Sequence, residues 1–323
     1  MNTVRDGIIG VAIGDMLGVP VEFTERSERD ADPVTGLREG GPNAQEKGTW
    51  SDDTSLTLCL AESLTKGFSL TDIAQSFLDW KVHAKWTARG VVFDMGRQTH
   101  VALNDIERIL ESGDTESLLY LQYEADEQTN GNGSLMRTLP LYFYLKEKGI
   151  EENFETIWQV SALTHGHIRS ALACLIYLIM IDELQKQSSI QEAYRATQHR
   201  TKVFFKENDI SEEEQKHFAR LIEEDISQID RDKLNGWGYV MNALEISFWA
   251  LLTTRSFEEA VLKAINLGQD TDTNGAVTGG LAGIFYGIDS APKDWYQSVA
   301  RIDEIEQLCD TLDNKYKAVS RGV

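Results

Sequence analysis

Apolar residues recur at helical spacing along almost the whole chain, and this repeat constrains the fold more than any other feature. Leu56, Cys59 and Leu60 show the three- and four-residue spacing of one helix face. No stretch alternates apolar and polar residues over the length of a useful strand. We therefore expect an all-α protein. Further helices are predicted over 101–111, 138–148, 153–164, 168–187, 190–207, 211–229, 237–254, 256–267, 274–286 and 302–316.

The sequence contains no sign of a boundary between domains. Its 323 residues could form one large domain or two of ordinary size. Only five prolines are present, however, and no stretch is rich enough in proline, serine or glycine to serve as a linker. We expect residues 1–323 to form a single compact multi-helix domain, and the protein to be a monomer.

The chain carries a formal net charge of −21. Such an acidic surface repels nucleic-acid backbones and anionic lipid headgroups, so neither nucleic acid nor a membrane is an expected partner. It suits cations, either divalent metal ions or a basic protein. Acidic runs at 212–214 and 223–225 are interpreted as solvated helix faces.

Neither a membrane span nor a disulfide is expected. The longest apolar run, 171–181, is too short to cross a bilayer. Cys59, Cys174 and Cys309 are odd in number, scattered, and set within apolar helical stretches, which is typical of core residues. The cysteines therefore favour a reducing compartment, the cytoplasm.

Two acidic turns stand directly before predicted helices, at 48–54 and 268–275. Each holds two aspartates together with hydroxyl side chains: Asp52 and Asp53 in the first, Asp270 and Asp272 in the second. One aspartate would be explained as an N-cap, which contributes about 1 kcal/mol. Four carboxylates that met in space would repel one another unless cations lay between them. Hard oxygen ligands suit Mg²⁺ or Mn²⁺.

The helix predicted after the second turn is rich in glycine. Gly275, Gly279 and Gly283 recur every four residues and leave one face without side chains. Each interior glycine costs about 1 kcal/mol relative to alanine, so a packing role is favoured. The N-terminal segment has its own stripe of small residues and is the expected neighbour. Its glycines are Gly7, Gly10 and Gly14.

A series of motifs between residues 5 and 290 is specific when taken together. They are Gly14-Asp15-x-x-Gly18 with Glu22, Trp50-Ser51-Asp52-Asp53-Thr54, Gly131-Asn132-Gly133-Ser134-x-Met136-Arg137, Thr164-His165 and Gly268-x-Asp270-Thr271-Asp272-Thr273. In this order they closely resemble the motifs of the ADP-ribosylglycohydrolase family. That family includes the glycohydrolase that removes ADP-ribose from an arginine of dinitrogenase reductase. The resemblance implies an all-α fold with two Mg²⁺ or Mn²⁺ ions in a central cleft.

The resemblance also assigns roles to individual residues. It implies that the metal ligands are Ser51, Asp52, Asp53, Asp270, Asp272 and Thr273. Either Asp53 or Glu22 would accept a proton from the attacking water, and Asp94 would lie on the leaving-group side. The remaining substrate contacts would be Gly131, Asn132, Gly133, Ser134, Met136 and His165. From the residues alone, the loop at 130–134, followed by a helix near Leu135, is compatible with a phosphate site, but a plain turn would look much the same and is favoured.

The resemblance implies hydrolysis of the glycosidic bond between ADP-ribose and a modified side chain, arginine being preferred. The substrate would be an ADP-ribosylated protein or a small ADP-ribosyl compound. Two alternatives remain open: the same chemistry on serine-linked or nucleotide-type substrates, and a binding or immunity protein that has lost catalysis. A metal phosphohydrolase would require basic residues near the acidic turns, where only Lys47 and Lys263 are found.

Overall fold

The computed structural model describes residues 2–317, and in this range the chain folds into helices joined by loops, without a β-strand. The α-helices are α1 (Thr3–Gly18), α2 (Arg26–Ala31), α3 (Asp52–Lys66), α4 (Leu70–His83), α5 (Arg97–Ser112), α6 (Leu139–Leu145), α7 (Phe154–Ala162), α8 (Ile168–Lys186), α9 (Ile190–Glu207), α10 (Glu212–His217), α11 (Ala219–Ile222), α12 (Val240–Leu252), α13 (Phe257–Ile265), α14 (Thr271–Tyr286), α15 (Lys293–Ser298) and α16 (Ile302–Lys317). The 3₁₀ helices are η1 (Val19–Val21), η2 (Thr115–Glu124), η3 (Glu151–Asn153), η4 (Ile226–Gln228), η5 (Arg231–Lys233) and η6 (Ile288–Ser290). The all-α prediction is confirmed.

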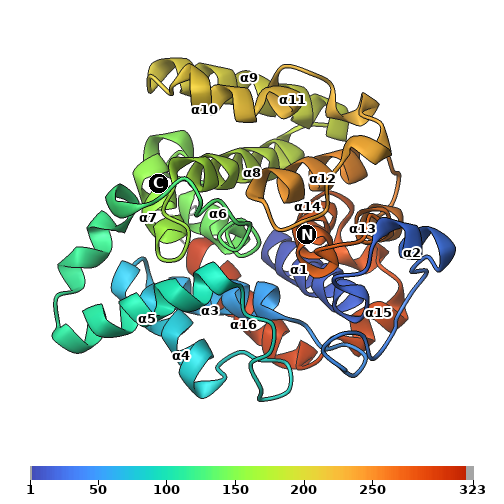
Figure 1. Cartoon of the computed structure of the whole chain (residues 1–323), viewed down its shortest axis with the longest axis horizontal. Coiled ribbons are helices and arrows are strands. Elements are labelled where there is room, and N and C mark those ends of the chain that lie inside the picture. The colour runs from blue at the N-terminus through green and yellow to red at the C-terminus, as the bar shows by residue number, and fades with distance from the viewer. Residues whose placement is uncertain (1, 318–323) are drawn as a thin grey trace.

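Helices α1 and α14 pack against each other at the centre of the molecule (Figure 1). Their glycine stripes face one another so closely that a Cβ on Gly10 would overlap the carbonyl oxygen of Gly279. A Cβ on Gly14 would likewise overlap the carbonyl oxygen of Gly275. The expected pairing of the two glycine-rich segments is therefore confirmed, and the contact explains why both helices accept the conformational cost of glycine.

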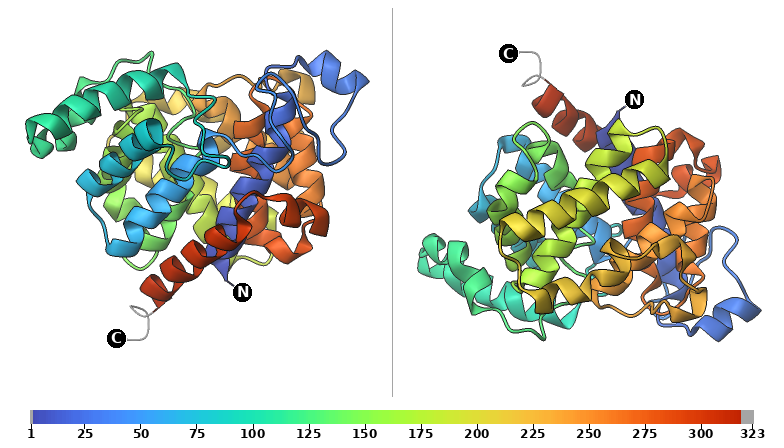
Figure 2. Two further views of the ribbon diagram at one scale, coloured as in Figure 1. Left: turned by 90° about the horizontal axis from the view of Figure 1, so that it is seen from below. Right: turned by 90° about the horizontal axis from the view of Figure 1, so that it is seen from above.

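The other helices surround this central pair. Helices α3 and α16 pack on α1, while α8, α12 and α13 pack on α14 (Figures 1 and 2). Helix α9 covers the outer side of α8. All of these elements contribute to one continuous apolar core, in which Cys59, Cys174 and Cys309 are buried free thiols. The described helices thus form one compact domain, and none of them is long and apolar enough to cross a membrane.

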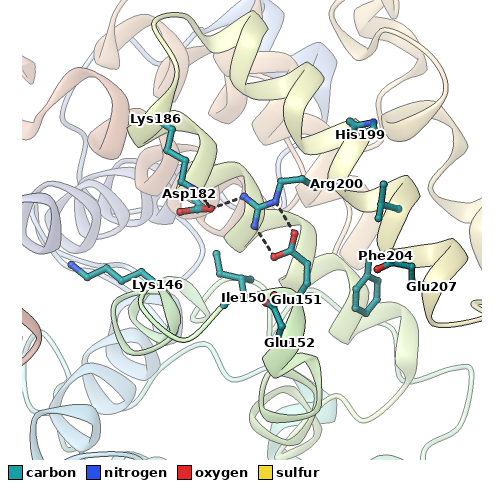
Figure 3. Close-up of a pocket in the computed structure, with 12 residues that line it drawn as sticks. Lys146, Ile150, Glu151, Glu152, Asp182, Lys186, His199, Arg200, Phe204 and Glu207 are labelled. Carbon is teal, nitrogen blue, oxygen red and sulfur yellow. Dashed lines mark hydrogen bonds and ion pairs between the residues drawn. The ribbon is translucent and has the colours of Figure 1, made fainter. Parts of the chain in front are cut away.

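A cluster of ion pairs joins α9 and η3 to α8 (Figure 3). The Arg200 guanidinium on α9 donates two hydrogen bonds of 2.6 Å to Glu151 of η3. It also reaches Asp182 and Glu183 on α8, at 2.5 and 2.6 Å. These charges border a cavity of about 460 Å³, but the guanidinium is already shared among three carboxylates. We therefore interpret this region as a structural cross-link.

The helix predicted over 211–229 is wrong as a single element. The chain forms α10, α11 and η4 there, because Phe218, Leu221 and Ile226 turn into the core. The acidic run at its start is only partly solvated, since Glu214 forms an ion pair with the buried Arg169 at 2.8 Å. A partner that lies 45 residues away cannot be identified from helix periodicity.

Several predicted helix starts differ from the structure by three or four residues, among them 101 and 237, where α5 and α12 begin at Arg97 and Val240. Helix α14 begins at Thr271 and not at 274, and α3 begins at Asp52 and not near Ser55. The helix expected near Leu135 begins at Leu139, because Pro140 occupies its first turn and suits that position. Asp52, Asp53 and Asp272 therefore lie in the first turns of helices, and Asp270 is the N-cap residue of α14. No helix begins between residues 131 and 138.

Candidate metal centre

The first acidic turn is held in place by Asp15 of α1. The Asp15 carboxylate accepts backbone N–H bonds from Ser51 at 2.9 Å and Thr54 at 3.0 Å, and a bond from the Thr54 hydroxyl at 2.6 Å. Complete burial raises the pKa of Asp15 to about 6, while these donors act in the opposite direction. Asp15 therefore ties the start of α3 to the central helix pair.

The second acidic turn is anchored to the same end of α1. The Thr271 hydroxyl donates to the carbonyl of Gly18 at 2.8 Å, beyond the glycine contact between α1 and α14. Gln269 pairs with the chain that follows Glu22: its N–H donates to Thr24 and its carbonyl accepts from Phe23, both at 2.7 Å. Glu22 is thereby carried to the start of α14.

The two acidic turns meet, as the sequence predicted. The Thr273 hydroxyl donates to Asp53 Oδ2 at 3.3 Å, although the two residues are 220 positions apart. Glu22, Asp270 and Asp272 each offer a carboxylate oxygen, and these oxygens lie within 4.8 Å of one another. Side chains from three separate segments of the chain therefore form a single acidic cluster.

The cluster is buried and short of positive charge. Burial, followed by repulsion from neighbouring carboxylates, raises the pKa values of Asp52, Asp53 and Asp272 well above their usual range. The same two causes raise the pKa of Glu22 to about 9. Asp53 Oδ1 and Asp272 Oδ2 are buried with no hydrogen-bond donor within residues 2–317. Buried oxygens without donors, in a cluster of mutually repelling carboxylates, fit divalent cations such as Mg²⁺ or Mn²⁺.

Asp94 joins this cluster from the loop before α5. It has a left-handed backbone conformation, with φ of 48°, and it lines the same cavity as Asp52 and Asp270. Burial is the main cause of its raised pKa. Such a conformation is uncommon outside glycine, and aspartate tolerates it better than most residues. The structure therefore brings Asp94 next to the acidic turns.

A cavity of about 450 Å³ opens onto the cluster. Four carboxylates of the cluster and Thr273 line it, together with most of the residues predicted to contact substrate. These lining residues are Glu22, Asp52, Asp94, Asp270, Thr273, Gly131, Asn132, Gly133, Met136 and His165. Asn132 connects the two groups, because its Nδ2 donates to Asp270 Oδ2 at 2.8 Å.

His165 packs against the two glycines of the 131–133 loop. A Cβ on Gly131 would lie 2.9 Å from His165 Nε2, and one on Gly133 would lie 2.6 Å from Cε1. The glycines are therefore needed for the imidazole to fit. Burial and the nearby Arg137 guanidinium lower the pKa of His165 to about 3, so its ring is neutral at physiological pH.

Some predicted site residues lie outside the cavity lining. Ser51, Asp53 and Asp272 are buried beneath it, in the two acidic turns. The Ser134 hydroxyl faces the core, where it accepts a hydrogen bond from Ser161 at 2.9 Å. The backbone of the 131–134 loop, and not the Ser134 side chain, is therefore directed to the cavity.

Trp237 and Gly238 line the cavity although neither was predicted as a site residue. The predicted helix 237–254 begins only at Val240, which leaves both residues in a loop. The carbonyl of Gly238 accepts from the N–H of Asn132 at 3.0 Å and so supports the 131–133 loop. The alternation of glycine with asparagine and tryptophan at 235–238 is a turn signal that could have indicated this loop.

The fold and the site define an all-α protein with a buried carboxylate centre that fits divalent cations, beside a cavity large enough for a nucleotide-sized ligand. The chain belongs to the ADP-ribosylglycohydrolase family, whose model matches residues 1–321. It is accordingly a hydrolase of ADP-ribosyl glycosidic bonds, in a family that depends on metal ions.

Named relatives and a solved structure cover nearly the whole chain. It is 28% identical to the ADP-ribosylarginine hydrolase Tri1 of Pseudomonas putida, over 97% of this chain and 78% of that protein. It is 26% identical to the ADP-ribosyl-[dinitrogen reductase] glycohydrolase of Rhodospirillum rubrum, over 94% of this chain and 93% of the relative. A solved ADP-ribosylglycohydrolase-related protein complex is 29% identical, covers 98% of both chains and superposes with a TM-score of 0.78.

Proposed function

We propose that this protein hydrolyses the N-glycosidic bond between ADP-ribose and an arginine side chain. The observation that carries the proposal is the meeting of two distant acidic turns with Glu22 and Asp94 at one cavity. Relatives named for arginine-linked and dinitrogen-reductase-linked ADP-ribose support the choice of substrate. Three buried free thiols suit the reducing conditions of the cytoplasm.

Six side chains would hold two divalent ions, Mg²⁺ or Mn²⁺: Ser51, Asp52, Asp53, Asp270, Asp272 and Thr273. When bound, the ions supply positive charge that offsets the carboxylates and lowers the pKa of water. The donor-free oxygens of Asp53 and Asp272 support this assignment, because each of them needs a partner.

The chain's own residues then bind and orient the substrate. The backbone N–H groups of Gly131 and Gly133 and the neutral His165 ring would hold the diphosphate and the proximal ribose. A neutral imidazole can donate one hydrogen bond there without adding a charge. Asp94 would pair with the guanidinium of the substrate arginine, since carboxylates bind this group with two parallel hydrogen bonds.

In the chemical step, water forms a C–O bond to the anomeric carbon of the distal ribose and its proton passes to Glu22 or Asp53. The C–N bond breaks with its electron pair on the guanidinium nitrogen, so arginine leaves as a neutral guanidine that then takes up a proton. Positive charge that develops on the ribose is stabilised by the surrounding carboxylates. Glu22 is favoured as the proton acceptor, because it lines the cavity while Asp53 is buried beneath it. Bound cations would offset the repulsion from neighbouring carboxylates that raises the pKa of Glu22, and so would leave it ionised for this role.

The test is release of ADP-ribose from matched arginine-linked and serine-linked ADP-ribosyl peptides in the presence of Mg²⁺ or Mn²⁺. We expect release from the arginine-linked peptide, and none by the Asp270→Ala/Asp272→Ala variant. Circular dichroism would verify that this variant keeps its helical content. Release only from the serine-linked peptide would reassign the linkage. Binding of ADP-ribose without turnover of either peptide would indicate a protein that has lost catalysis.

A further inference from the structure

A second hollow, of about 220 Å³, adjoins the metal-side cavity. Gln98 lines both spaces and so lies between them. Its Nε2 donates at 3.1 Å to the carbonyl of Thr164, a residue that lines the second hollow. The hollow lies between α5, η2 and the end of α7, and its lining is mainly apolar. The apolar side chains are Val101, Ala102, Ile106, Leu121, Ala125, Ala162 and Leu163.

The segment that borders this hollow exposes an unusual share of apolar side chains. We call residues 97–127, which include α5 and η2, the α5–η2 arm. In Figures 1 and 2 this segment extends away from the body of the molecule. Nine large apolar side chains are exposed within residues 2–317, and four of them lie on the arm: Val101, Leu119, Tyr120 and Tyr123. Exposed apolar side chains gathered in this way are typical of interaction surfaces.

The arm is also strongly acidic. It contains eight carboxylates and two arginines, a net charge of −6. Arg108 on the arm pairs with Asp105 beside it. Glu111, Asp114, Glu116 and Asp126 have no ion-pair partner in the part of the chain that the structure describes. Free carboxylates beside apolar side chains complement a partner that is basic and carries apolar residues.

The arm begins at the edge of the metal-side cavity, close to Asp94. Asp94 lies three residues before α5, and both it and the first residues of α5 line the metal-side cavity. If Asp94 binds the substrate guanidinium, the polypeptide that carries this arginine must leave the cavity beside the start of the arm. The arm is therefore placed to contact residues that flank the modified arginine.

We propose that the α5–η2 arm docks the polypeptide segment around the ADP-ribosylated arginine of a protein substrate. The segment is basic, and one of its apolar side chains enters the hollow beside Gln98. This inference rests on the proposed function, and it adds a class of substrate: arginine within a basic polypeptide, as distinct from a free ADP-ribosylated amino acid.

The test compares two substrates with the same glycosidic bond: free ADP-ribosyl-arginine and a lysine-rich peptide that carries ADP-ribosyl-arginine. We expect Val101→Ser/Tyr120→Ser, and separately Glu111→Lys/Asp114→Lys/Glu116→Lys, to raise KM for the peptide about tenfold. KM for free ADP-ribosyl-arginine should stay unchanged, as should kcat for both substrates. The controls are Val203→Ser on α9 and Glu212→Lys/Glu213→Lys/Glu224→Lys, because these side chains are exposed, far from the arm in sequence, and the three carboxylates have no ion-pair partner within residues 2–317.

Binding of the same peptide without ADP-ribose, followed by fluorescence anisotropy at low ionic strength, tests docking independently of catalysis. The wild-type protein should bind it, and the arm variants should bind about tenfold more weakly. Equal losses on both substrates would overturn the docking role and assign the hollow to the nucleotide. No binding of the peptide by the wild-type protein would also overturn it. Peptide binding by the arm without hydrolysis of either substrate would support docking and overturn the proposed function.

Discussion

His165 is a buried histidine whose environment keeps it neutral. Its Nδ1 lies 2.8 Å from the Thr164 hydroxyl, and two glycines pack against the ring. Burial lowers its pKa to about 3, whereas a histidine in the unfolded chain titrates near 6.5. Between these two pH values the unfolded chain binds a proton that the folded chain does not. This histidine therefore reduces the free energy of unfolding as the pH falls below about 6.5.

Replacing His165 should make the protein less sensitive to acid. From pH 7 to pH 5 the wild-type protein is expected to lose about 2 kcal/mol through this residue alone, and His165→Asn should not lose it. Urea unfolding of both proteins at the two pH values measures the difference. The other five histidines are common to both proteins, so their contribution cancels. An identical acid dependence in the variant would contradict the low pKa.

Asn132 orients a predicted metal ligand, because its side-chain amide donates to Asp270. Groups that orient a ligand in this way typically contribute 10- to 100-fold to metal affinity or activity. We expect Asn132→Ala to weaken Mn²⁺ binding about tenfold in isothermal titration calorimetry. Asn130→Ala is the matched control, since the Asn130 amide contacts His167 and the carbonyl of Glu127 and no carboxylate of the cluster. Equal losses in both variants would indicate only a damaged loop.

A site residue could be predicted from the sequence when it belongs to a short motif. It could not be predicted when its role depends on a partner that is distant in the sequence. The aspartates at 52–53 and 270–272 stood out by their local density and do meet. Glu214, in contrast, was interpreted as a solvated residue, and its ion pair with Arg169 depends on how α10 folds back over α8. Trp237 was missed for a similar reason, because its helix begins three residues later than the apolar repeat predicted.

At the scale of helices, the glycine contact between α1 and α14 sets the position of the acidic turns. Gly14 precedes Asp15, which holds the first turn, and Gly275 lies in the first turns of the helix that carries Asp272. Any increase in the distance between the two helices would separate these anchors. The sequence predicted this contact because glycines recur at helical spacings of three or four residues in both segments. It did not predict the exact helix starts, which depend on side chains such as Pro140.

Gly14→Ala should therefore be strongly destabilising. Its Cβ would overlap the carbonyl of Gly275, a backbone atom that cannot move by a change of rotamer. We expect a loss of about 3 kcal/mol or more in the free energy of unfolding, together with loss of metal binding. Gly36→Ala is the control: its Cβ would lie 3.8 Å from the Trp295 indole nitrogen, an ordinary contact. A variant Gly14→Ala as stable as Gly36→Ala would show that the helices can separate without cost.

At the scale of the whole molecule, two sources of electrostatic repulsion act on the fold. One is the overall charge of −21, which is spread over the surface and is screened by any salt. The other is the buried acidic cluster, which bulk salt screens much less. Only cations that enter the cluster can offset the second source. The two contributions can therefore be separated by the kind of cation that is added.

Monovalent salt and Mg²⁺ should stabilise the protein in different ways. In metal-free protein, adding 0.15 M NaCl is expected to raise Tm for the wild type and for Asp270→Ala/Asp272→Ala alike, because both keep most of the surface charge. Adding Mg²⁺ at about 100 times its Kd, at constant ionic strength, contributes about 2.7 kcal/mol for each ion that the protein binds. For a chain of this length that is a rise of about 4 °C in Tm for each ion, expected in the wild type only. The Asp270→Ala/Asp272→Ala variant without metal should unfold at a higher temperature than the metal-free wild type, since two repelling carboxylates are gone.

Differential scanning calorimetry measures Tm for both proteins, with and without NaCl or Mg²⁺. An equal rise with Mg²⁺ in both proteins would mean that the ion acts on the surface, and that the acidic turns do not bind it.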